Sequence, residues 1–349
     1  MLLPIVVKRY NPLLFNNETL IAAKGNKVYR FSQSFTKPEE VAKFDEGFFK
    51  NVLSHNSLYL RILRRGIQSL AMNENGDFIG AINKNIIYKS RDENVFYPVF
   101  NGFRGSRPLS LTYGDGRFVF GEYFNNKNRE EVHIFSSYNG KNWDKAYTFP
   151  KGHIRHVHSI KYDYYKKGYW VLTGDNDNEC GIWFTADQFK SLNPVLKGGQ
   201  YARAVNIIAL QNHLIIPMDS PLEQNYIQLY NIENNILEHV AKIPGSAFHA
   251  IESDGIMLVS TVTEPSEINK VNSAMLWGSL DGKKWKCICE LKKDIYPVSL
   301  QHIFRYAEIV LTPGKNLTSY ITAFGRSLKR KDNSMLIWKK NELRDFLKN

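Results

Sequence analysis

Two stretches of the chain carry one seven-residue pattern: Ser137-Tyr138-Asn139-Gly140-Lys141-Asn142-Trp143 and Ser279-Leu280-Asp281-Gly282-Lys283-Lys284-Trp285. Both read Ser-x-[Asp/Asn]-Gly-Lys-x-Trp, and each follows a short apolar run of the kind that forms a strand. In a tight turn, Gly adopts positive φ without a steric penalty, and an Asp or Asn side chain accepts backbone N–H groups. The pattern therefore predicts a β-hairpin turn with its Trp packed into the sheet.

Related turns recur along the chain at nearly constant spacing. One reference residue in each turn gives positions 90, 137, 185, 231, 279 and 327, which are separated by 47, 48, 46, 48 and 48 residues. A period in the forties, with four strand-like runs in each unit, is typical of β-propellers, because a single blade cannot bury both faces of its sheet. We therefore predict an all-β fold, a single β-propeller domain over residues 1–349 with four-stranded blades of about 48 residues.

The residues before position 90 leave room for one complete repeat and part of another. This length allows six or seven blades, and we prefer seven, with Leu14 to Phe44 forming part of the first. A short C-terminal helix at about 340–348 is predicted, because Leu343, Phe346 and Leu347 fall on one face at helical spacing. A weaker helical pattern covers Lys37 to Phe49.

Composition narrows the class of protein. Lys and Arg exceed Asp and Glu by 46 − 34 = 12, but the positive charges are spread along the chain without a nucleic-acid-binding motif, so nucleic acid is not an expected partner. No apolar run approaches the roughly 20 residues that span a membrane. The absence of a charged leader, together with three cysteines that lack framework spacing, predicts a cytoplasmic protein, with leaderless export left open.

Basic residues precede the expected innermost strand of most blades, where a propeller opens onto its central mouth. Four arginines, Arg65, Arg107, Arg155 and Arg203, are spaced by 42, 48 and 48 residues. Uncompensated positive charges repel one another, and guanidinium groups match carboxylates in a bidentate way. We therefore predict that an anionic substrate binds to these four arginines together with Tyr201, His249 and His302.

The most distinctive stretch is Gly152 to Asp163. Its His156 and His158 are two residues apart in a strand and so point to the same face. They could share a divalent metal, or one could act as a general acid or base; no other cofactor is expected. Glu122 and Asp175 each follow the second strand of a blade, and Tyr123 is a further candidate base or nucleophile if an arginine lowers its pKa. The predicted catalytic set is His156, His158, Glu122, Asp175 and Tyr123.

The two Ser-x-[Asp/Asn]-Gly-Lys-x-Trp turns resemble the Asp box, or BNR repeat, of sialidases and related glycoside-active propellers, shortened by one residue. The resemblance covers about residues 80 to 340 as architecture and the two turns as sequence. It implies a β-propeller, three arginines that clamp a carboxylate, a Tyr/Glu nucleophile pair and an Asp acid/base. It is evidence for the fold more than for the activity, because the Asp box is a folding device.

Together these features favour a carbohydrate-active propeller that acts on an acidic oligosaccharide or polysaccharide of sialic-type or uronic sugars. The enzyme would be a sialidase-like glycoside hydrolase or a polysaccharide lyase that acts by β-elimination. The alternative is a non-catalytic propeller that binds polysaccharide or a protein partner in surface-glycan metabolism. Clustering of Glu122, Asp175 and His156 in one pocket would favour the enzyme, and the sequence leaves the oligomeric state open.

Overall fold

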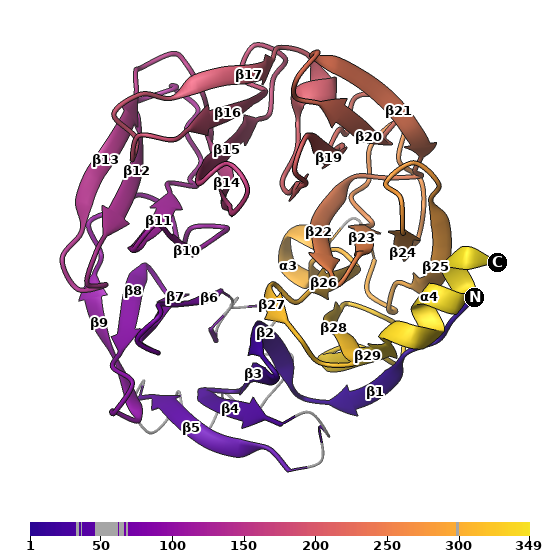
Figure 1. The fold of residues 1–349 in the computed structure, drawn as a ribbon, viewed down its shortest axis with the longest axis horizontal. Helices are drawn as coiled ribbons and strands as arrows, with labels where there is room; N and C mark the ends of the chain where they lie inside the picture. Colours follow the sequence, from indigo (N-terminus) through magenta and orange to yellow (C-terminus); the bar gives the residue numbers. More distant parts are fainter. Residues whose placement is uncertain (33–34, 36, 46–61, 63–65, 68, 298–299) are drawn as a thin grey trace. The chain divides into compact units, whose positions relative to one another are not determined.

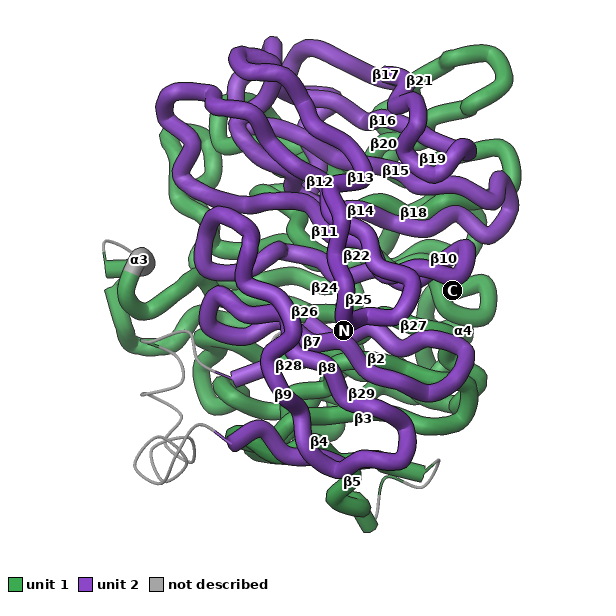
Figure 2. The backbone as a smooth tube through the Cα atoms, turned by 90° about the vertical axis from the view of Figure 1, so that its left-hand side faces the viewer, with its two compact units in different colours: residues 1–41, 46–65, 206–349 green, residues 42–45, 66–205 purple. Residues whose placement is uncertain are grey.

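The computed structural model describes residues 1–349 except 33–34, 36, 46–61, 63–65, 68 and 298–299, together with the side chains of residues 301 and 302. The described chain divides into two compact units, coloured separately in Figure 2. Unit 1 comprises Met1–Val41, Glu46–Arg65 and Asn206–Asn349, and unit 2 comprises Ala42–Asp45 and Gly66–Val205. The single domain predicted from the sequence stays a prediction.

Unit 2 contains two four-stranded antiparallel sheets and a third antiparallel group, β6–β9, which belongs to a nine-stranded sheet; Figure 1 shows these three blades in succession along the chain. The first blade is β6 (Leu70–Met72), β7 (Phe78–Ile82), β8 (Asn85–Lys89) and β9 (Val95–Phe100). The second is β10 (Thr112–Gly114), β11 (Arg117–Gly121), β12 (Val132–Ser137) and β13 (Asp144–Phe149). The third is β14 (His156–Asp163), β15 (Gly168–Gly174), β16 (Gly181–Thr185) and β17 (Asn193–Lys197), and the 3-10 turn η1 (Gln200–Ala202) follows it.

Unit 1 contains two blades of consecutive strands and two that include N-terminal strands. The first of the consecutive blades is β18 (Ile208–Ala209), β19 (His213–Pro217), β20 (Tyr226–Asn231) and β21 (Ile236–Lys242). The second is β22 (Ala247–Ser253), β23 (Ile256–Thr261), β24 (Ser273–Ser279) and β25 (Lys286–Lys292). A third joins β26 (Glu308–Leu311), β28 (Tyr320–Arg326) and β29 (Ser334–Lys339) to the N-terminal β1 (Ile5–Lys8). The fourth contains β2 (Asn11–Asn17), β3 (Thr19–Lys24), β4 (Lys27–Phe31) and the first residues of β5 (Glu39–Phe44), with β27 (Gly314–Asn316) parallel to β2. Residues 42–44 of β5 belong to unit 2.

The described residues form five four-stranded sheets and one nine-stranded sheet, in which the groups β2–β5 and β6–β9 are joined through β5 and β9. Counting these two groups as separate blades gives the preferred number of seven, and the predicted all-β propeller class is confirmed. The repeat register is confirmed at five of the six reference positions, each of which is the last residue of a third strand or the residue directly after it: Ser90, Ser137, Thr185, Asn231 and Ser279. At the sixth position it is wrong, because Ser327 follows β28, the second strand of its blade.

The helices agree with the sequence at one place and differ at another. The C-terminal helix α4 (Lys340–Lys348) lies where it was predicted. The helix suggested over residues 37–49 is wrong in its described part, because Glu39–Phe44 form strand β5. Ala42 and Phe44 are buried at strand spacing, and Lys43 and Phe44 pair in parallel with Val95 and Phe96 of β9. The remaining residues, 46–49, lie outside the described part of the chain.

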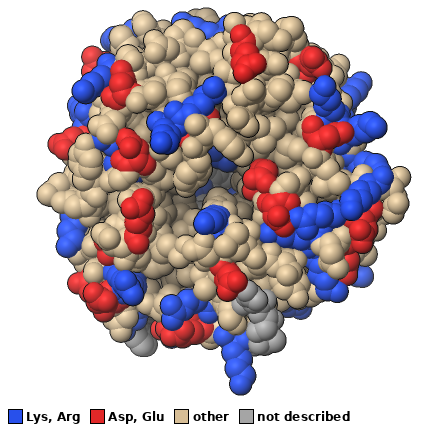
Figure 3. Space-filling model, viewed as in Figure 1, with Lys and Arg blue, Asp and Glu red and all other residues tan. Residues whose placement is uncertain are grey.

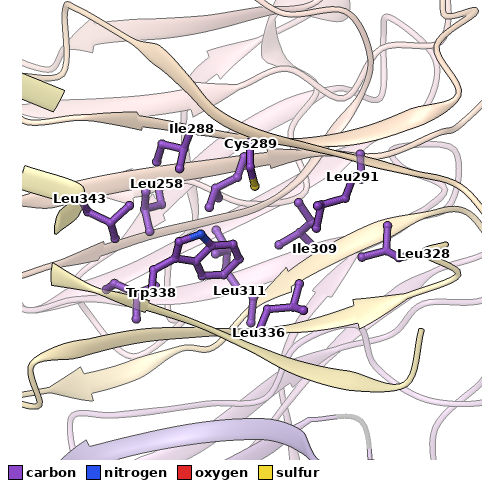
Figure 4. Close-up of a cluster of buried hydrophobic side chains, with 14 of the residues drawn as sticks. Leu258, Ile288, Cys289, Leu291, Ile309, Leu311, Leu328, Leu336, Trp338 and Leu343 are labelled. Carbon is purple, nitrogen blue, oxygen red and sulfur yellow. The ribbon is translucent and has the colours of Figure 1, made fainter. Parts of the chain in front are cut away.

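The hydrophobic cores lie between neighbouring blades. In unit 1, side chains of the β22–β25 blade pack against β26, β28, β29 and α4; Figure 4 shows Trp338 among Leu258, Leu311 and Leu343. In unit 2, Val157 and Ile160 of β14 pack with Val119 and Ile134 of the preceding blade. Second strands such as β7, β11 and β15 are buried at every residue, so their ends are held rigidly. Those ends carry the site described below.

The two repeated turns have the predicted geometry, one in each unit. Asn139 Oδ1 accepts hydrogen bonds from the N–H groups of Lys141 and Asn142, both at 2.9 Å. Asp281 Oδ1 accepts the equivalent bonds from Lys283 and Lys284 at 2.8 and 2.7 Å.

The glycine and tryptophan positions of these turns also correspond. Gly140 and Gly282 both have φ 73°, which an L side chain rarely adopts. Trp143 and Trp285 donate their indole N–H to the carbonyl oxygen of that glycine, at 3.0 Å in each case. The pattern is a folding device at the turn between the third and fourth strands.

No helix in the described ranges is long and apolar enough to cross a membrane.

Candidate functional site

The candidate site lies in unit 2, where β14 begins and β15 ends. Arg155 precedes β14, His156 is its first residue, and Asp175 directly follows β15. Arg203 follows the 3-10 turn η1. We call Arg155, His156, His158, Asp175 and Arg203 the Asp175 cluster.

A β-bulge directs His158 toward this cluster. Val157 pairs with Thr173 and Ser159 pairs with Leu172, so His158 is an extra residue in its strand. The close approach of His158 requires glycine at position 174, because a Cβ atom there would lie 2.7 Å from His158 Cε1. The rings of His156 and His158 lie 5.1 Å apart, on the same side as predicted.

Four side chains converge on the Asp175 carboxylate. Arg155 Nη1 donates to Oδ2 at 2.8 Å, and Arg203 Nη2 lies 3.3 Å from Oδ1. His156 Nε2 lies 3.5 Å from Oδ2, and His158 Nε2 lies 3.3 Å from Oδ1. Two guanidinium groups and two imidazole rings therefore surround one negative charge.

Both imidazole rings are held through their Nδ1 atoms by backbone carbonyl groups. His156 Nδ1 lies 3.2 Å from the carbonyl oxygen of Phe124, and His158 Nδ1 lies 3.1 Å from that of Ala204. A carbonyl oxygen only accepts hydrogen bonds, so each Nδ1 carries the proton when the bond is made. In a neutral ring the Nε2 atom then carries a lone pair, which faces the carboxylate.

Burial and charge shift the ionisation of this cluster in opposite directions. Burial alone would raise the pKa of Asp175, but the His156 and His158 rings facing its oxygens hold that pKa far below its usual range. Burial lowers the pKa of His158 by more than Asp175 raises it, which favours the neutral ring. The cluster therefore keeps an ionised carboxylate beside two guanidinium groups.

The cluster has buried nitrogen atoms with spare bonding capacity and one exposed edge. Arg155 Nε and His156 Nε2 are buried and have no hydrogen-bond partner among the described residues. Side-chain exposure is 32 % for Arg155 and 16 % for Asp175, so a ligand can reach the cluster from that edge. The Tyr123 ring lies 4.1 Å from the His156 ring and forms one wall.

Glu122, the second predicted catalytic carboxyl group, is held in a different arrangement. Its side chain is 1 % exposed and binds the Arg104 guanidinium group, the Arg104 N–H at 2.8 Å and the His133 N–H at 3.0 Å. Both carboxylate oxygens are occupied by these bonds, which tie together three segments of the blade. This geometry gives Glu122 a structural role, and a catalytic role for it stays a prediction.

The remaining predicted binding residues are distributed over the chain. Arg107 is half-buried in the loop between β9 and β10, and Tyr201 lies in η1 with its hydroxyl donating to the Lys197 carbonyl oxygen at 3.3 Å. His302 lies in the four-residue helix α3 (Gln301–Phe304), and its side chain is outside the described part. Arg65 is also outside the described residues.

The other predicted residue, His249, belongs to a second cluster, which lies in unit 1. Its Nε2 atom lies 3.6 Å from Glu308 Oε2, to which Arg326 Nη1 donates at 2.7 Å. Burial would raise the pKa of Glu308, but Arg326 and His249 outweigh it and lower that pKa to about 2. We call His249, Glu308 and Arg326 the Glu308 cluster.

Several groups that complete the Asp175 cluster were not predicted from the sequence. Asn125 Oδ1 accepts a bond from Arg155 Nη2 at 3.1 Å, and Gln200 Nε2 donates to the Asp175 carbonyl oxygen at 3.1 Å. The carbonyl groups that hold the two histidines belong to Phe124 and Ala204, whose side chains give no indication of the role. The only signal in the sequence for Gln200 was its place directly before Tyr201, which is a predicted binding residue.

Comparison with known proteins supports the fold alone. No family model matches the chain, and no curated protein matches it in sequence. Similar solved structures include a propeller chain of "Crystal Structure of Mitotic Checkpoint Complex", with 12 % identity and a TM-score of 0.60 over 97 % of this chain and 94 % of that one. Another is the propeller of "YCF48 bound to D1 peptide", with 9 % identity and a TM-score of 0.56 over 97 % and 95 % of the two chains. The chain has the β-propeller fold, and its resemblance to sialidases stays a prediction.

Surface charge does not gather in one patch on the face drawn in Figure 3. Lys and Arg side chains are interspersed there with Asp and Glu side chains.

Proposed function

We propose that this propeller binds an acidic saccharide, of the sialic-type or uronic class, at the Asp175 cluster. The observation that carries the proposal is the convergence of Arg155, Arg203 and two buried imidazole rings on one carboxylate. A carboxylate of a sugar acid can use the Arg155 edge, where a guanidinium group offers the bidentate geometry that carboxylates prefer.

Local charge supports the anionic class of ligand. Two guanidinium groups and two imidazole rings lie at one carboxylate, so basic side chains predominate in this cluster. Partly buried charges interact more strongly than solvated ones, so an anionic group that contacts Arg155 here would be bound more strongly than at a solvated arginine. Tyr123 beside His156 adds an aromatic surface of the kind on which a sugar ring can pack.

A reaction at this cluster would be an elimination more readily than a hydrolysis. Hydrolysis through paired carboxyl groups needs a second free carboxyl group, and the carboxylate of Glu122 is enclosed by Arg104 and backbone N–H groups. In β-elimination, the arginines would neutralise the uronate carboxylate while Tyr123 or His156 takes the adjacent proton. The bond to the leaving sugar then breaks as a C=C bond forms.

A screen of uronic and sialylated oligosaccharides tests the proposal, with neutral oligosaccharides of equal length as controls. Binding is measured by calorimetry, and reaction by new reducing ends and by absorbance of a C=C bond. We expect binding of at least one acidic series and none of the neutral series. Reducing ends alone would indicate hydrolysis, and both signals together would indicate elimination.

Two variants localise that binding. Arg155→Ala is expected to abolish it, whereas Lys151→Ala removes a positive charge from an exposed ion pair of the same unit and should leave it unchanged. Equal binding by the two variants would contradict the proposal. Binding of a peptide instead of any saccharide would favour the protein-binding alternative; the similar YCF48 structure holds a peptide.

A further inference from the structure

We infer that His156, His158 and Asp175 form a binding site for a divalent transition metal, with Zn²⁺ as the reference ion. These residues each offer one ligand atom, and the three atoms lie within 4.8 Å of one another. The inference concerns the cation held by the cluster and does not depend on the saccharide proposed above.

The first argument is the orientation of the two rings. Each Nδ1 faces a backbone carbonyl oxygen and is protonated, so each Nε2 faces an oxygen of Asp175 as a lone pair facing an acceptor. In that tautomer both Nε2 atoms and the Asp175 carboxylate offer lone pairs to the same region, which is the arrangement that a metal ion needs.

The two rings are placed to share one buried cation. His156 is 4 % exposed and His158 is 3 % exposed, and their ring centroids lie 5.1 Å apart. One shared cation would make direct bonds to both rings. His156 Nε2, which has no hydrogen-bond partner among the described residues, would then gain one.

The distances and the ligand set fit a metal of this class. A tetrahedral Zn²⁺ with bonds of about 2.0–2.1 Å separates neighbouring ligand atoms by about 3.4 Å. The separation is 3.5 Å from His156 Nε2 to Asp175 Oδ2 and 3.3 Å from His158 Nε2 to Asp175 Oδ1, and the three ligand atoms all lie within 4.8 Å of one another. Two imidazoles and one carboxylate are ligands typical of zinc sites that keep a fourth position open.

The surroundings of the ligands have the features of a metal site. Metal-binding histidines usually donate the second ring N–H to a carbonyl or carboxylate group, which fixes the ring and its tautomer, and both rings here do so. Arg155 and Arg203 bind the carboxylate from its other sides and orient it. A metal beside two guanidinium groups would make the fourth position favourable for an anion. Of the two candidate bases, Tyr123 is then the one that is not a ligand of the ion.

The experiment measures Zn²⁺ binding to tag-free full-length protein that has been dialysed against a chelator. We expect calorimetry to give one Zn²⁺ per chain, and Co²⁺ to give a visible spectrum of a tetrahedral site. His156→Ala and His158→Ala should each weaken Zn²⁺ binding by more than about 100-fold, since outer partners alone are typically worth 10–100-fold. His133→Ala is the matched control, because its ring binds Thr148 Oγ1 in the same unit at 2.9 Å.

Failure to bind one Zn²⁺ per chain, or equal affinity in the two ligand variants and the control, would overturn the inference. If the ligand variants do not fold, X-ray absorption spectroscopy of the zinc-loaded natural sequence tests whether the two histidines bind the ion. Scattering from two imidazoles at about 2.0–2.1 Å supports the site, and its absence rejects it.

The saccharide screen, repeated with and without chelator, separates the two proposals. Saccharide binding without any Zn²⁺ binding would support the proposed function and reject the metal site. Zn²⁺ binding without saccharide binding would support the metal site and reject the proposed function.

Discussion

The two units are built from the same kind of blade, yet they gather different side chains where their inner strands begin. In unit 2, two arginines and two histidines surround Asp175. In unit 1, one arginine and one histidine contact Glu308. Both β14 and β22 carry a bulge near the start, so the backbone arrangement alone does not make a site. The contact of two arginines and two histidines with one carboxylate distinguishes the Asp175 cluster.

The largest expected effect is on stability when each central carboxylate is neutralised. Asp175→Asn removes the carboxylate that two guanidinium groups contact and should lower the free energy of unfolding at pH 7 by about 3 kcal/mol. Glu308→Gln removes the carboxylate that Arg326 contacts and should cost about 2 kcal/mol. Urea denaturation of both variants checks the order, and a larger loss for Glu308→Gln would break the comparison.

A second expected effect is the pH dependence that Glu308 contributes. Its pKa is about 2 in the folded protein against an ordinary value of 4.5, because Arg326, His249 and Arg305 favour the charged form. A lowered pKa means that the unfolded state binds the proton more readily. The stability from Glu308 is therefore complete above about pH 4.5 and is lost as the pH falls toward 2.

Unfolding midpoints measured from pH 6 to pH 2 test this prediction. The difference between the natural sequence and Glu308→Gln should shrink steadily below about pH 4.5. A difference that stays constant over this range would show that the Glu308 cluster does not favour the charged carboxylate.

The smallest expected effect compares the matched turns of the two units. Gly140→Ala and Gly282→Ala both place a side chain at φ 73°, which costs about 1 kcal/mol. The new Cβ atom would lie 2.5 Å from Ile79 Cδ1 in the first case and 3.1 Å from Ile215 Cδ1 in the second. Both isoleucines are fully buried, so the shorter contact should make Gly140→Ala cost about 1 kcal/mol more than Gly282→Ala. Thermal denaturation of both variants measures the difference, and equal costs would contradict the tighter packing at Gly140.

Much of the fold could be predicted because its signals are local. The turn pattern requires a side-chain acceptor, a glycine with positive φ and a Trp within seven residues, so every copy marks the same point in a blade. Strand β5 was misread because its buried residues, Ala42 and Phe44, are too few to establish an alternation. Its pairing with β9 depends on residues about fifty positions away.

The candidate site was only partly predictable. His156 and His158 were identified from their spacing, and Asp175 from its place after the second strand. The carbonyl groups of Phe124 and Ala204 could not be found, because every residue carries a carbonyl group and only the folded chain selects two of them. The enclosure of Glu122 by Arg104 likewise depends on a contact between distant segments, so its sequence position resembled that of Asp175.

The most direct test of the central claim compares one arginine from each cluster. A uronic trisaccharide and a sialylated trisaccharide are titrated into the natural sequence, Arg203→Gln and Arg326→Gln at one fixed salt concentration. If the Asp175 cluster binds the acidic group, Arg203→Gln weakens binding of the better ligand by about 30-fold, as expected for the loss of a charged hydrogen bond. Arg326→Gln should then leave the affinity within about twofold. Equal weakening by both variants, or a loss confined to Arg326→Gln, would contradict the account.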